Sequence, residues 1–586
     1  MQEIKLFNRA LNTTNQSFKD VNSLAVCKGY IVAKECCNDR VVDYLQTLPD
    51  NINTTFYGSW VEVTGKNRLE LAIDQVMHYM STYGTNHEGP AYVPNDNPAH
   101  IDFTDCKTIL PISPMEIQVK IQAMLDSGVA MKQETIEDCV ALVQELDLSI
   151  NVDSIKNREA LIIFCDRLGL VPSASVEMVR YLIYKAMGGT LIINSPEVLG
   201  QIAQSNLDIT FLVKEFGIDK LSSVFYRFKR IFMAFKKANK ANSHIVNRLR
   251  RRAKVNHKPL VQSFWNNILS DTSLLPQLEE RLDELNNFRK IALLQSIKER
   301  QKNTGILPVR VRNGKLFITH RTNRDHGHLN LMYQMIYDSL VDSLSKKACS
   351  VKYPKGLNLA MPSSEKAFIG NIPFGSYVET DVDTIVGINW READGLSDLD
   401  LSASLLNGDK LGWNSDYTNS GKTMVYSGDM TSARPEATEL FYCKDGAENS
   451  IIKTNLFRGT EHSEYTFFIA KVGNYQGSGS YNDTSMIDPN DVVFSTRLKM
   501  SQSEMTNGIF LNDRFIFVNL SSGNARVSRN NPLMIEYLNH MQATSDCFLD
   551  VEKVLIDAGF TATKDDAYVG LDLSVLDKSS LLELMG

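Results

Sequence analysis

The apolar residues of this chain follow two different periods, and the change between them limits the fold more than any other feature. From about 109 to 305 they recur every three to four residues, as in helices that bury one face. From about 356 to 530 they form short alternating runs separated by Gly, Asp, Ser and Thr, which is typical of strands joined by turns. With 586 residues the chain is also too long for a single core. A multidomain α+β protein is therefore expected.

Five regions follow from these patterns and from the positions of Gly and Pro. The helical stretch is expected to stack paired helices, in the manner of HEAT repeats. The alternating runs are expected to form an antiparallel β-sandwich. The expected regions are a small mixed α/β unit (1–108), the α-helical domain (109–305), a connector with a hairpin and a helix (306–355), the sandwich (356–530) and a small α/β tail (531–586).

Within these regions, local signals predict individual elements. Residues 55–63 are rich in aromatic and β-branched side chains and predict a strand, whereas 67–80 have helical spacing. Asn313-Gly314 between two apolar runs predicts a two-residue hairpin turn. In the segment 67–83, His78, Tyr79 and Tyr83 are candidates to line a pocket, although burial beside other aromatics is the simpler interpretation.

The composition is that of a soluble globular protein, with 43% hydrophobic and 22% charged residues. No signal-peptide core and no apolar run of about 18 residues is visible, so we expect a cytoplasmic protein without a membrane contact. Nine cysteines without a CxxC pair indicate reduced thiols. His320, His326 and His328 raise a zinc hypothesis, but the charged residues between them favour a solvated loop.

Carboxylates gather where one predicted strand begins and again about thirty residues later. The side-chain period of a strand is two, so Asp398 and Asp400 share one face while Leu399 and Leu401 share the other. Hard cations such as Ca²⁺ take six to eight oxygen ligands, mainly carboxylates and carbonyls. A calcium site is therefore predicted, with loop solubilisation or strand-edge charge as the alternative. The candidate ligands are Asp394, Asp398, Asp400, Asp429, Glu436 and Glu439.

The same residues carry a resemblance. IPFGSY at 372–377, GINW at 387–390, DLDLSA at 398–403 and YSGD at 426–429 together resemble the tellurium-resistance (TerD-like) stress proteins of bacteria and phages. The resemblance spans about 360–530 and implies a calcium-binding β-sandwich in a stress-response or phage-related scaffold or binding protein. It implies Asp394, Asp398, Asp400 and Asp429 as ligands, whereas Glu436 and Glu439 rest on their chemistry alone.

Two limits apply to this resemblance. After Asp429 the chain departs from the family, because 431–439 replaces a run of Gly and Asp. Tellurite resistance itself is not implied, since a family name does not fix the function of a fused member.

Catalytic motifs such as Gly-x-Ser-x-Gly, His-Glu-x-x-His and the nucleotide-binding glycine fingerprints are absent from the sequence. Glu392, Asp394 and Asp398 could supply a general acid and base, but a cation site explains their clustering more simply. No enzyme is therefore predicted.

A basic segment is the second strong signal. Residues 221–270 contain no Asp or Glu, although the net charge of the whole chain is −7. They predict an RNA or DNA contact, an acidic protein partner, or docking onto the acidic sandwich of the same or a second copy, as in a self-assembling structural component. A solvated face without a partner is the remaining alternative. The interleaved aromatics have helical spacing, which favours core packing over base stacking. The candidate contact residues are Arg227, Lys229, Arg230, Lys236, Lys237, Lys240, Arg248, Arg250, Arg251, Arg252 and Lys254.

Overall fold

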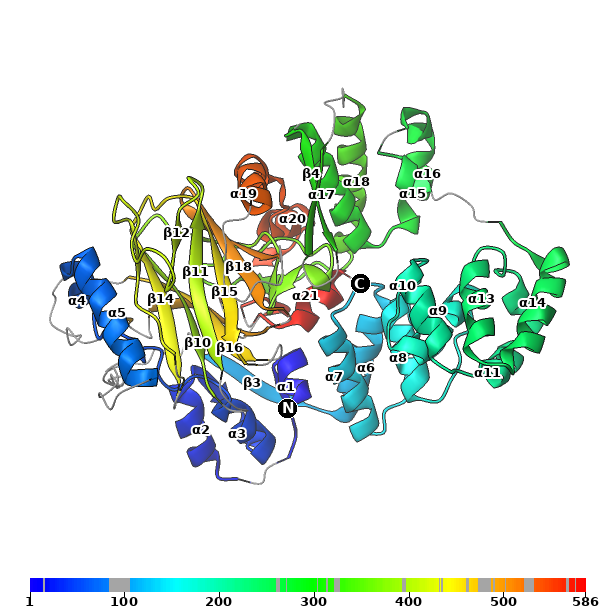
Figure 1. Ribbon diagram of the computed structural model, residues 1–586, viewed down its shortest axis with the longest axis horizontal. Coiled ribbons are helices and arrows are strands. Elements are labelled where there is room, and N and C mark those ends of the chain that lie inside the picture. The colour runs from blue at the N-terminus through cyan, green and yellow to red at the C-terminus, as the bar shows by residue number, and fades with distance from the viewer. Residues whose placement is uncertain are drawn as a thin grey trace. The chain divides into compact units, whose positions relative to one another are not determined.

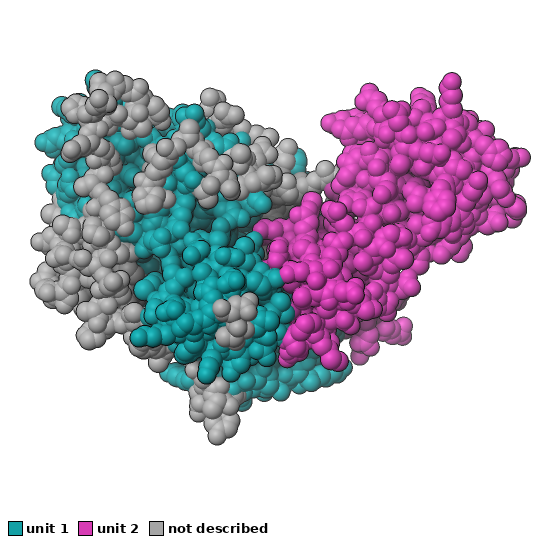
Figure 2. All heavy atoms as spheres, turned by 90° about the horizontal axis from the view of Figure 1, so that it is seen from below, with its two compact units in different colours: residues 1, 3–112, 287–584 teal, residues 2, 113–286, 585–586 magenta. Residues whose placement is uncertain are grey.

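The protein divides into two compact units, one of which is built from two separate stretches of chain (Figure 2). Unit 1 holds 3–112 and 287–584, and unit 2 holds 113–286. Unit 1 combines helices with antiparallel sheets, which confirms an α+β protein. The computed structural model describes 1–13, 16–83, 106–259, 264–269, 271–302, 304–311, 315–320, 327–392, 397–431, 433, 436–459, 463–472, 486–487, 491–500, 502–520, 532–564, 569–574 and 576–585.

In the described part of unit 2, all of the regular secondary structure is helical. Its first helix begins with a capping box, in which Ser113 Oγ accepts from the Glu116 N–H and the Glu116 carboxylate accepts from the Ser113 N–H. Its helices are α6 (Pro114–Asp126), α7 (Gln133–Glu145), α8 (Arg158–Arg167), α9 (Ser175–Met187), α10 (Pro196–Gln204), α11 (Thr210–Phe216), α12 (Ile218–Ser222), α13 (Lys229–Ala238), α14 (Asn242–Asn256), α15 (Phe264–Asn267) and α16 (Leu278–Arg281).

The apolar faces of α8 to α14 share one core in unit 2. Leu182 from α9, Phe232 from α13 and Leu249 from α14 are all fully buried in it. Asn242 also lies in this core, where its side chain donates to the carbonyls of Leu207 and Phe235. A buried amide that finds these partners fixes the start of α14 against its neighbours.

Two antiparallel sheets form the centre of unit 1 (Figure 1). Their facing side chains include Phe467 and Phe515, whose rings stack at 5.9 Å, and Phe494 and Phe517 at 5.0 Å. Such contacts bury the inner faces of both sheets. One sheet has the order β13 (Met424–Tyr426), β14 (Ala437–Cys443), β10 (Thr384–Trp390), β16 (Glu464–Lys471) and β17 (Val492–Lys499). The other has the order β12 (Lys410–Leu411), β11 (Asp398–Leu405), β15 (Ser450–Arg458), β18 (Glu504–Leu511), β19 (Arg514–Leu520) and β9 (Tyr377–Glu379).

The N-terminal part of unit 1 holds a parallel sheet of order β1–β3–β2 and several helices. The strand predicted for 55–63 is wrong. Ser59 instead caps a helix by accepting from the Glu62 N–H, and Trp60 begins that helix. The helix predicted for 67–80 is confirmed. The elements are α1 (Gln2–Phe7), β1 (Arg9–Leu11), α2 (Phe18–Cys27), β2 (Tyr30–Val32), α3 (Asp39–Gln46), α4 (Trp60–Gly65), α5 (Arg68–Tyr83) and β3 (Lys107–Ile112).

The connector and the C-terminal tail complete unit 1. The strands of the predicted hairpin are confirmed, because β4 pairs antiparallel with β5, whereas the predicted turn at Asn313-Gly314 lies outside the described residues. A short strand at Leu571 in the tail pairs in parallel with β6 of the connector. The elements are α17 (Asn287–Lys302), β4 (Ile306–Val311), β5 (Lys315–His320), α18 (His328–Ser345), β6 (Ser350–Lys352), β7 (Phe368–Ile369), β8 (Ile372–Pro373), α19 (Pro532–Thr544), α20 (Val551–Asp557), β20 (Thr561–Ala562), β21 (Leu571–Asp572) and α21 (Lys578–Met585). None of the described helices is both long enough and apolar enough to cross a bilayer.

Candidate metal centre

Three carboxylates converge at one edge of the sandwich. Asp398, Asp400 and Asp429 each contribute one oxygen, and these three atoms lie within 4.8 Å of one another. Asp398 and Asp400 occupy alternate positions of β11, so strand geometry places them on one face. Asp429 arrives from the other sheet, on the loop that follows β13. The cluster therefore bridges the two sheets.

The loop that delivers Asp429 depends on a glycine. Gly428 has a φ of 96°, a backbone conformation that side chains with a Cβ rarely adopt. A Cβ at this position would also lie 2.8 Å from Cδ1 of Phe56. Glycine at 428 thus lets the loop turn toward β11 while Phe56, from the N-terminal part of unit 1, packs directly against it.

The three aspartates are buried, and one carboxylate oxygen of each has no hydrogen-bond partner among the residues that the structure describes. Their exposed fractions are 5%, 3% and 3% for Asp398, Asp400 and Asp429. Within the described part of the chain, Asp398 Oδ1, Asp400 Oδ2 and Asp429 Oδ1 have no hydrogen-bond partner. Buried charged groups are normally paired, hydrogen-bonded or bound to metal ions. Among the described residues, no other carboxylate has a buried oxygen without a hydrogen-bond partner.

Burial also changes how these carboxylates titrate. Desolvation, followed by the charges of Asp429 and Glu392, raises the pKa of Asp398 to about 7. Desolvation raises the pKa of Asp429 to about 6, against hydrogen bonds that lower it. The pKa of Asp400 lies well above its ordinary value, through desolvation and then the charges of Asp429 and Asp398. A nearby cation would favour the ionised forms.

Glu439 stands directly behind the cluster on β14. Its Oε2 accepts from the Leu401 N–H at 2.6 Å, and its Oε1 accepts from the Met430 N–H at 3.0 Å. Desolvation raises its pKa well above the ordinary value, and the charges of Asp429 and Asp400 add to that effect. Since both oxygens of Glu439 have backbone partners, this residue holds strand β11 and the loop after β13 together, and its ionised form adds negative charge.

Helix α5 reaches the same cluster from the N-terminal part of unit 1. The Tyr79 hydroxyl donates to Asp429 Oδ2, and the Gln75 Oε1 atom accepts from the Asp429 N–H at 3.4 Å. His78 Nε2 lies 3.1 Å from the Thr431 hydroxyl. The sequence marked His78 and Tyr79 as pocket candidates but gave no signal that they would face this loop. The side chain of Tyr83 lies outside the described residues.

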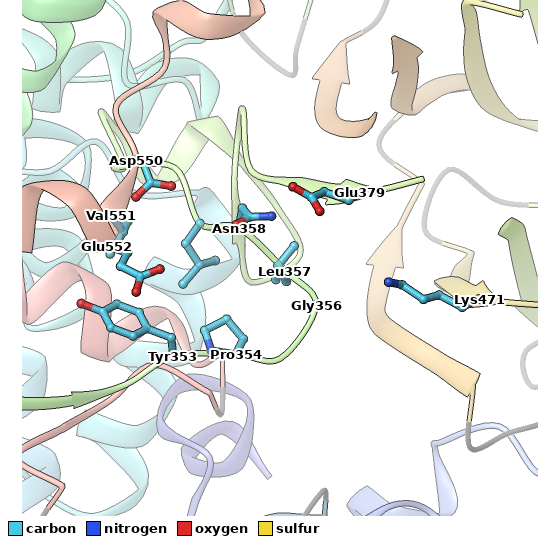
Figure 3. Close-up of a pocket in the computed structure, with 11 residues that line it drawn as sticks. Tyr353, Pro354, Gly356, Leu357, Asn358, Glu379, Lys471, Asp550, Val551 and Glu552 are labelled. Atoms are coloured by element: carbon cyan, nitrogen blue, oxygen red, sulfur yellow. The ribbon is translucent and has the colours of Figure 1, made fainter. Parts of the chain in front are cut away.

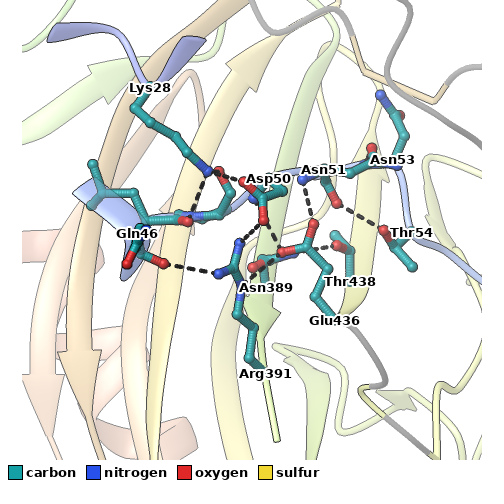
Figure 4. A network of polar contacts seen from close by, with 12 residues as sticks. Lys28, Gln46, Asp50, Asn51, Asn53, Thr54, Asn389, Arg391, Glu436 and Thr438 are labelled. Carbon is teal, nitrogen blue, oxygen red and sulfur yellow. Dashed lines mark hydrogen bonds and ion pairs between the residues drawn. The ribbon is translucent and has the colours of Figure 1, made fainter. Parts of the chain in front are cut away.

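Among the described residues, the sequence-predicted ligand Glu436 is not part of this group. Asp394 lies outside the described residues. Glu436 belongs to a separate polar network (Figure 4), in which it accepts from the Asp50 and Asn51 N–H groups and pairs with Arg391 Nε at 3.2 Å. Arg391 also donates to the Gln46 carbonyl at 3.0 Å. The role of Glu436 in the structure is to anchor the segment after α3 to the sheet.

A cavity of about 270 Å³ lies elsewhere in unit 1 (Figure 3). Glu379, Asp550 and Glu552 bring carboxylates to its wall, and Lys471 faces them from β16. Asp550 is already engaged as the N-cap of α20, where it accepts from the Lys553 N–H at 2.8 Å. Unlike the cluster, this cavity has partly exposed acids that water solvates, so its charges require no ligand.

The remaining candidates are dispersed. The basic residues of 221–258 are exposed or partly exposed around α13 and α14. His320 is 78% exposed and lies 3.7 Å from Glu536. His326 lies outside the described residues. The searched part of the chain shows no group of three or more possible metal ligands that includes these histidines.

Taken together, the geometry defines what the cluster can bind. Its donors are carboxylate oxygens, which hard cations prefer over the nitrogen and sulfur ligands of zinc or copper.

Comparison with known proteins does not assign the chain to a family or a function. No protein-family model matches the chain, and neither the curated proteins nor the solved structures contain a match.

Proposed function

We propose that the protein is a non-enzymatic calcium-binding protein of the cytoplasm, in which Asp398, Asp400 and Asp429 hold the cation. One observation carries this proposal: each of the three buried aspartates has an oxygen without a partner in the described structure. A cation among these oxygens would replace mutual repulsion by attraction. Backbone carbonyls and water would complete the six to eight ligands that calcium takes.

The resemblance to TerD-like stress proteins supports the same proposal. Two of its four motifs, DLDLSA at 398–403 and YSGD at 426–429, contain the three converging aspartates. On this basis we propose that unit 1 contains a TerD-like sandwich serving as a binding or scaffold module in a stress or phage-related response. Calcium would act through linkage, because a ligand that binds only the folded form stabilises it.

Calorimetric titration of the metal-stripped full chain with calcium tests the proposal. We expect saturable binding by the wild type and none by an Asp398→Asn/Asp400→Asn variant. A matched control is Asp445→Asn/Asp513→Asn, which removes the same charge from exposed positions of the same unit. The control should bind as the wild type does. Equal binding by the wild type and the Asp398/Asp400 variant would refute the assignment, and so would the absence of binding by the wild type.

Glu439 supplies a second, independent test. Glu439→Gln removes the ionisable group beside the site and, because an amide nitrogen cannot accept a hydrogen bond, leaves one of the Leu401 and Met430 N–H groups without its acceptor. Calcium affinity should fall by about tenfold, as is common when a group next to the ligands is changed. Binding stoichiometry should stay the same, whereas loss of a direct ligand would remove the site.

A further inference from the structure

Helix α13 separates its apolar and basic residues onto opposite faces. Ile231, Phe232 and Phe235 are fully buried in the core of unit 2. At 100° per residue, the four cations of α13 fall on the other side of the helix. Lys229, Arg230 and Lys237 are exposed there and Lys236 is partly exposed. The core therefore fixes which way the positive face points.

Helix α14 has the same organisation with a wider charged arc. Ile245, Leu249 and Ala253 form its buried stripe. The cations Arg248, Arg250, Arg251, Arg252 and Lys254 are all exposed and cover the remaining circumference. The helix rises about 1.5 Å per residue, so Arg248 and Lys254 are separated by about 9 Å along the axis. Three successive phosphates of a stacked strand span about 7 Å, a comparable distance.

Little within the protein neutralises these charges. Asp219 lies 3.2 Å from Arg252 Nε, and it is the one carboxylate within ion-pair distance of any cation of 227–258 among the described residues. No Asp or Glu occurs between 221 and 270. Like charges at this density repel one another across the two helices. A polyanion laid across them would relieve that repulsion and release its own counterions.

One aromatic ring lies exposed beside these cations. Of the aromatics interleaved with the basic residues, Phe225, Phe228, Phe232 and Phe235 are buried, which agrees with the core packing that their spacing favours. Tyr226 differs, with 41% of its surface exposed. Its ring meets the exposed His257 edge to face at 5.2 Å.

This aromatic pair has a fixed position at the end of α14. The Lys258 N–H donates to the Ser223 carbonyl at 2.9 Å, which ties the end of α14 to the segment before Tyr226. Arg227 and Lys258, both exposed, flank the pair. An aromatic face between cations is the arrangement on which unpaired bases stack while the backbone follows the charge.

We propose that the solvent face of α13 and α14, together with Tyr226 and His257, binds single-stranded nucleic acid. The twelve cations between Arg227 and Lys258 would contact phosphates, and Tyr226 would stack on a base. An acidic protein fits this surface less well. In 221–259 the large exposed apolar side chains are Tyr226 and Val255, too few for the apolar centre of a protein–protein interface.

Fluorescence anisotropy with the full chain tests this proposal. The probes are a labelled oligo(U) of about 20 nucleotides, longer than a usual site, and a duplex of equal length. Titrations at about 50 and 200 mM salt measure the electrostatic share of the affinity. We expect Arg250→Glu/Arg251→Glu to weaken binding at least tenfold and to make the salt dependence shallower by about two units of slope.

Two further variants separate this role from general effects of charge or folding. Tyr226→Leu should weaken single-strand binding by about fivefold or more and leave the salt slope unchanged, because it removes stacking alone. Lys156→Glu/Arg167→Glu changes the charge of unit 2 by the same amount at other exposed positions and should bind as the wild type does. Equal losses in this control would overturn the proposal. Displacement of the probe by polyglutamate at equal charge, or preference for the duplex, would overturn it as well.

Discussion

Tyr79, in the N-terminal part of unit 1, donates a hydrogen bond to a carboxylate of the acidic cluster. Its hydroxyl donates to Asp429 Oδ2, which leaves Oδ1 as the unpartnered oxygen of that carboxylate. A ligand oriented by a neighbouring donor binds a metal better than one that is free to rotate. Tyr79 thus sets the orientation of the one aspartate that comes from a loop.

Removing this hydroxyl should weaken calcium binding without removing the site. We expect Tyr79→Phe to lower the affinity by about tenfold at unchanged stoichiometry, since the ring still packs and only the donor is lost. Tyr57→Phe is a matched control, because Tyr57 donates to the Asp74 carboxylate at 3.0 Å in the same part of unit 1. Calorimetric titration of both variants compares them. Wild-type affinity in Tyr79→Phe would show that Asp429 needs no such donor.

The raised pKa values of Asp398 and Asp429 make stability depend on pH. Both pKa values lie above those of an unfolded aspartate, at about 7 and about 6. Between these pH values the folded form therefore holds protons that the unfolded chain has released. Proton binding thus stabilises the folded form at low pH, and this contribution to the free energy of unfolding is lost as the pH rises from about 4 to about 7.

Calcium should offset that loss, because it binds the ionised carboxylates. At pH 7.5 saturating calcium should raise the Tm of unit 1 by roughly 5 °C, and at pH 5 by much less, since protons compete for the same oxygens. Thermal scans at both pH values, with and without calcium, measure the difference. A calcium effect that is larger at pH 5 would contradict the assignment of these carboxylates.

At the scale of elements, Glu436 and Glu439 have different roles although they lie close together at the start of β14. Glu436 precedes the strand and anchors the segment after α3, while Glu439 within the strand faces the cluster. Their separation is odd, and side chains an odd number of positions apart point to opposite faces of an extended chain. Their separate roles follow from the register of one strand.

The anchor should contribute to stability and not to cation binding. Glu436→Gln breaks a buried ion pair with Arg391, whose side chain is 27% exposed, so the expected loss is about 2 kcal/mol, less than for a fully buried pair. Glu464→Gln, in a half-exposed pair with Arg497, should cost under about 1 kcal/mol. Chemical denaturation measures both. Calcium stoichiometry should stay unchanged in Glu436→Gln, and its loss would place Glu436 among the ligands.

The same elements show what the sequence could predict. Alternation along one strand placed Asp398 and Asp400 on a common face, because the period of a strand is a local property. The hairpin between β4 and β5 was predicted from an equally local signal. In contrast, residues 55–63 have strand composition, yet Ser59 caps a helix that begins at Trp60, so their second half is helical.

Such local patterns do not predict contacts between segments that are distant in the sequence. Tyr79 and Asp429 are 350 positions apart, and no periodicity links them. The pairing of β21 with β6 likewise joins the tail to the connector across 220 positions. Sequence patterns describe which face an element buries, whereas the partner of that face depends on the packing of the whole unit.

At the scale of the whole molecule, each of the two units carries one of the proposed sites. The carboxylate cluster lies in unit 1, and the basic face of α13 and α14 lies in unit 2. Each unit has its own apolar core, so we expect two unfolding transitions in differential scanning calorimetry. A ligand raises the transition of the unit that binds it, because it stabilises that folded form alone.

Calcium and an oligonucleotide should therefore move different transitions. Calcium should raise only the transition of unit 1, and Asp398→Asn/Asp400→Asn should abolish that shift. Oligo(U) should raise only the transition of unit 2, and Arg250→Glu/Arg251→Glu should abolish that one. A single transition moved by both ligands would mean that the two units unfold together. In that case cation binding and nucleic-acid binding would be coupled through the stability of one cooperative structure.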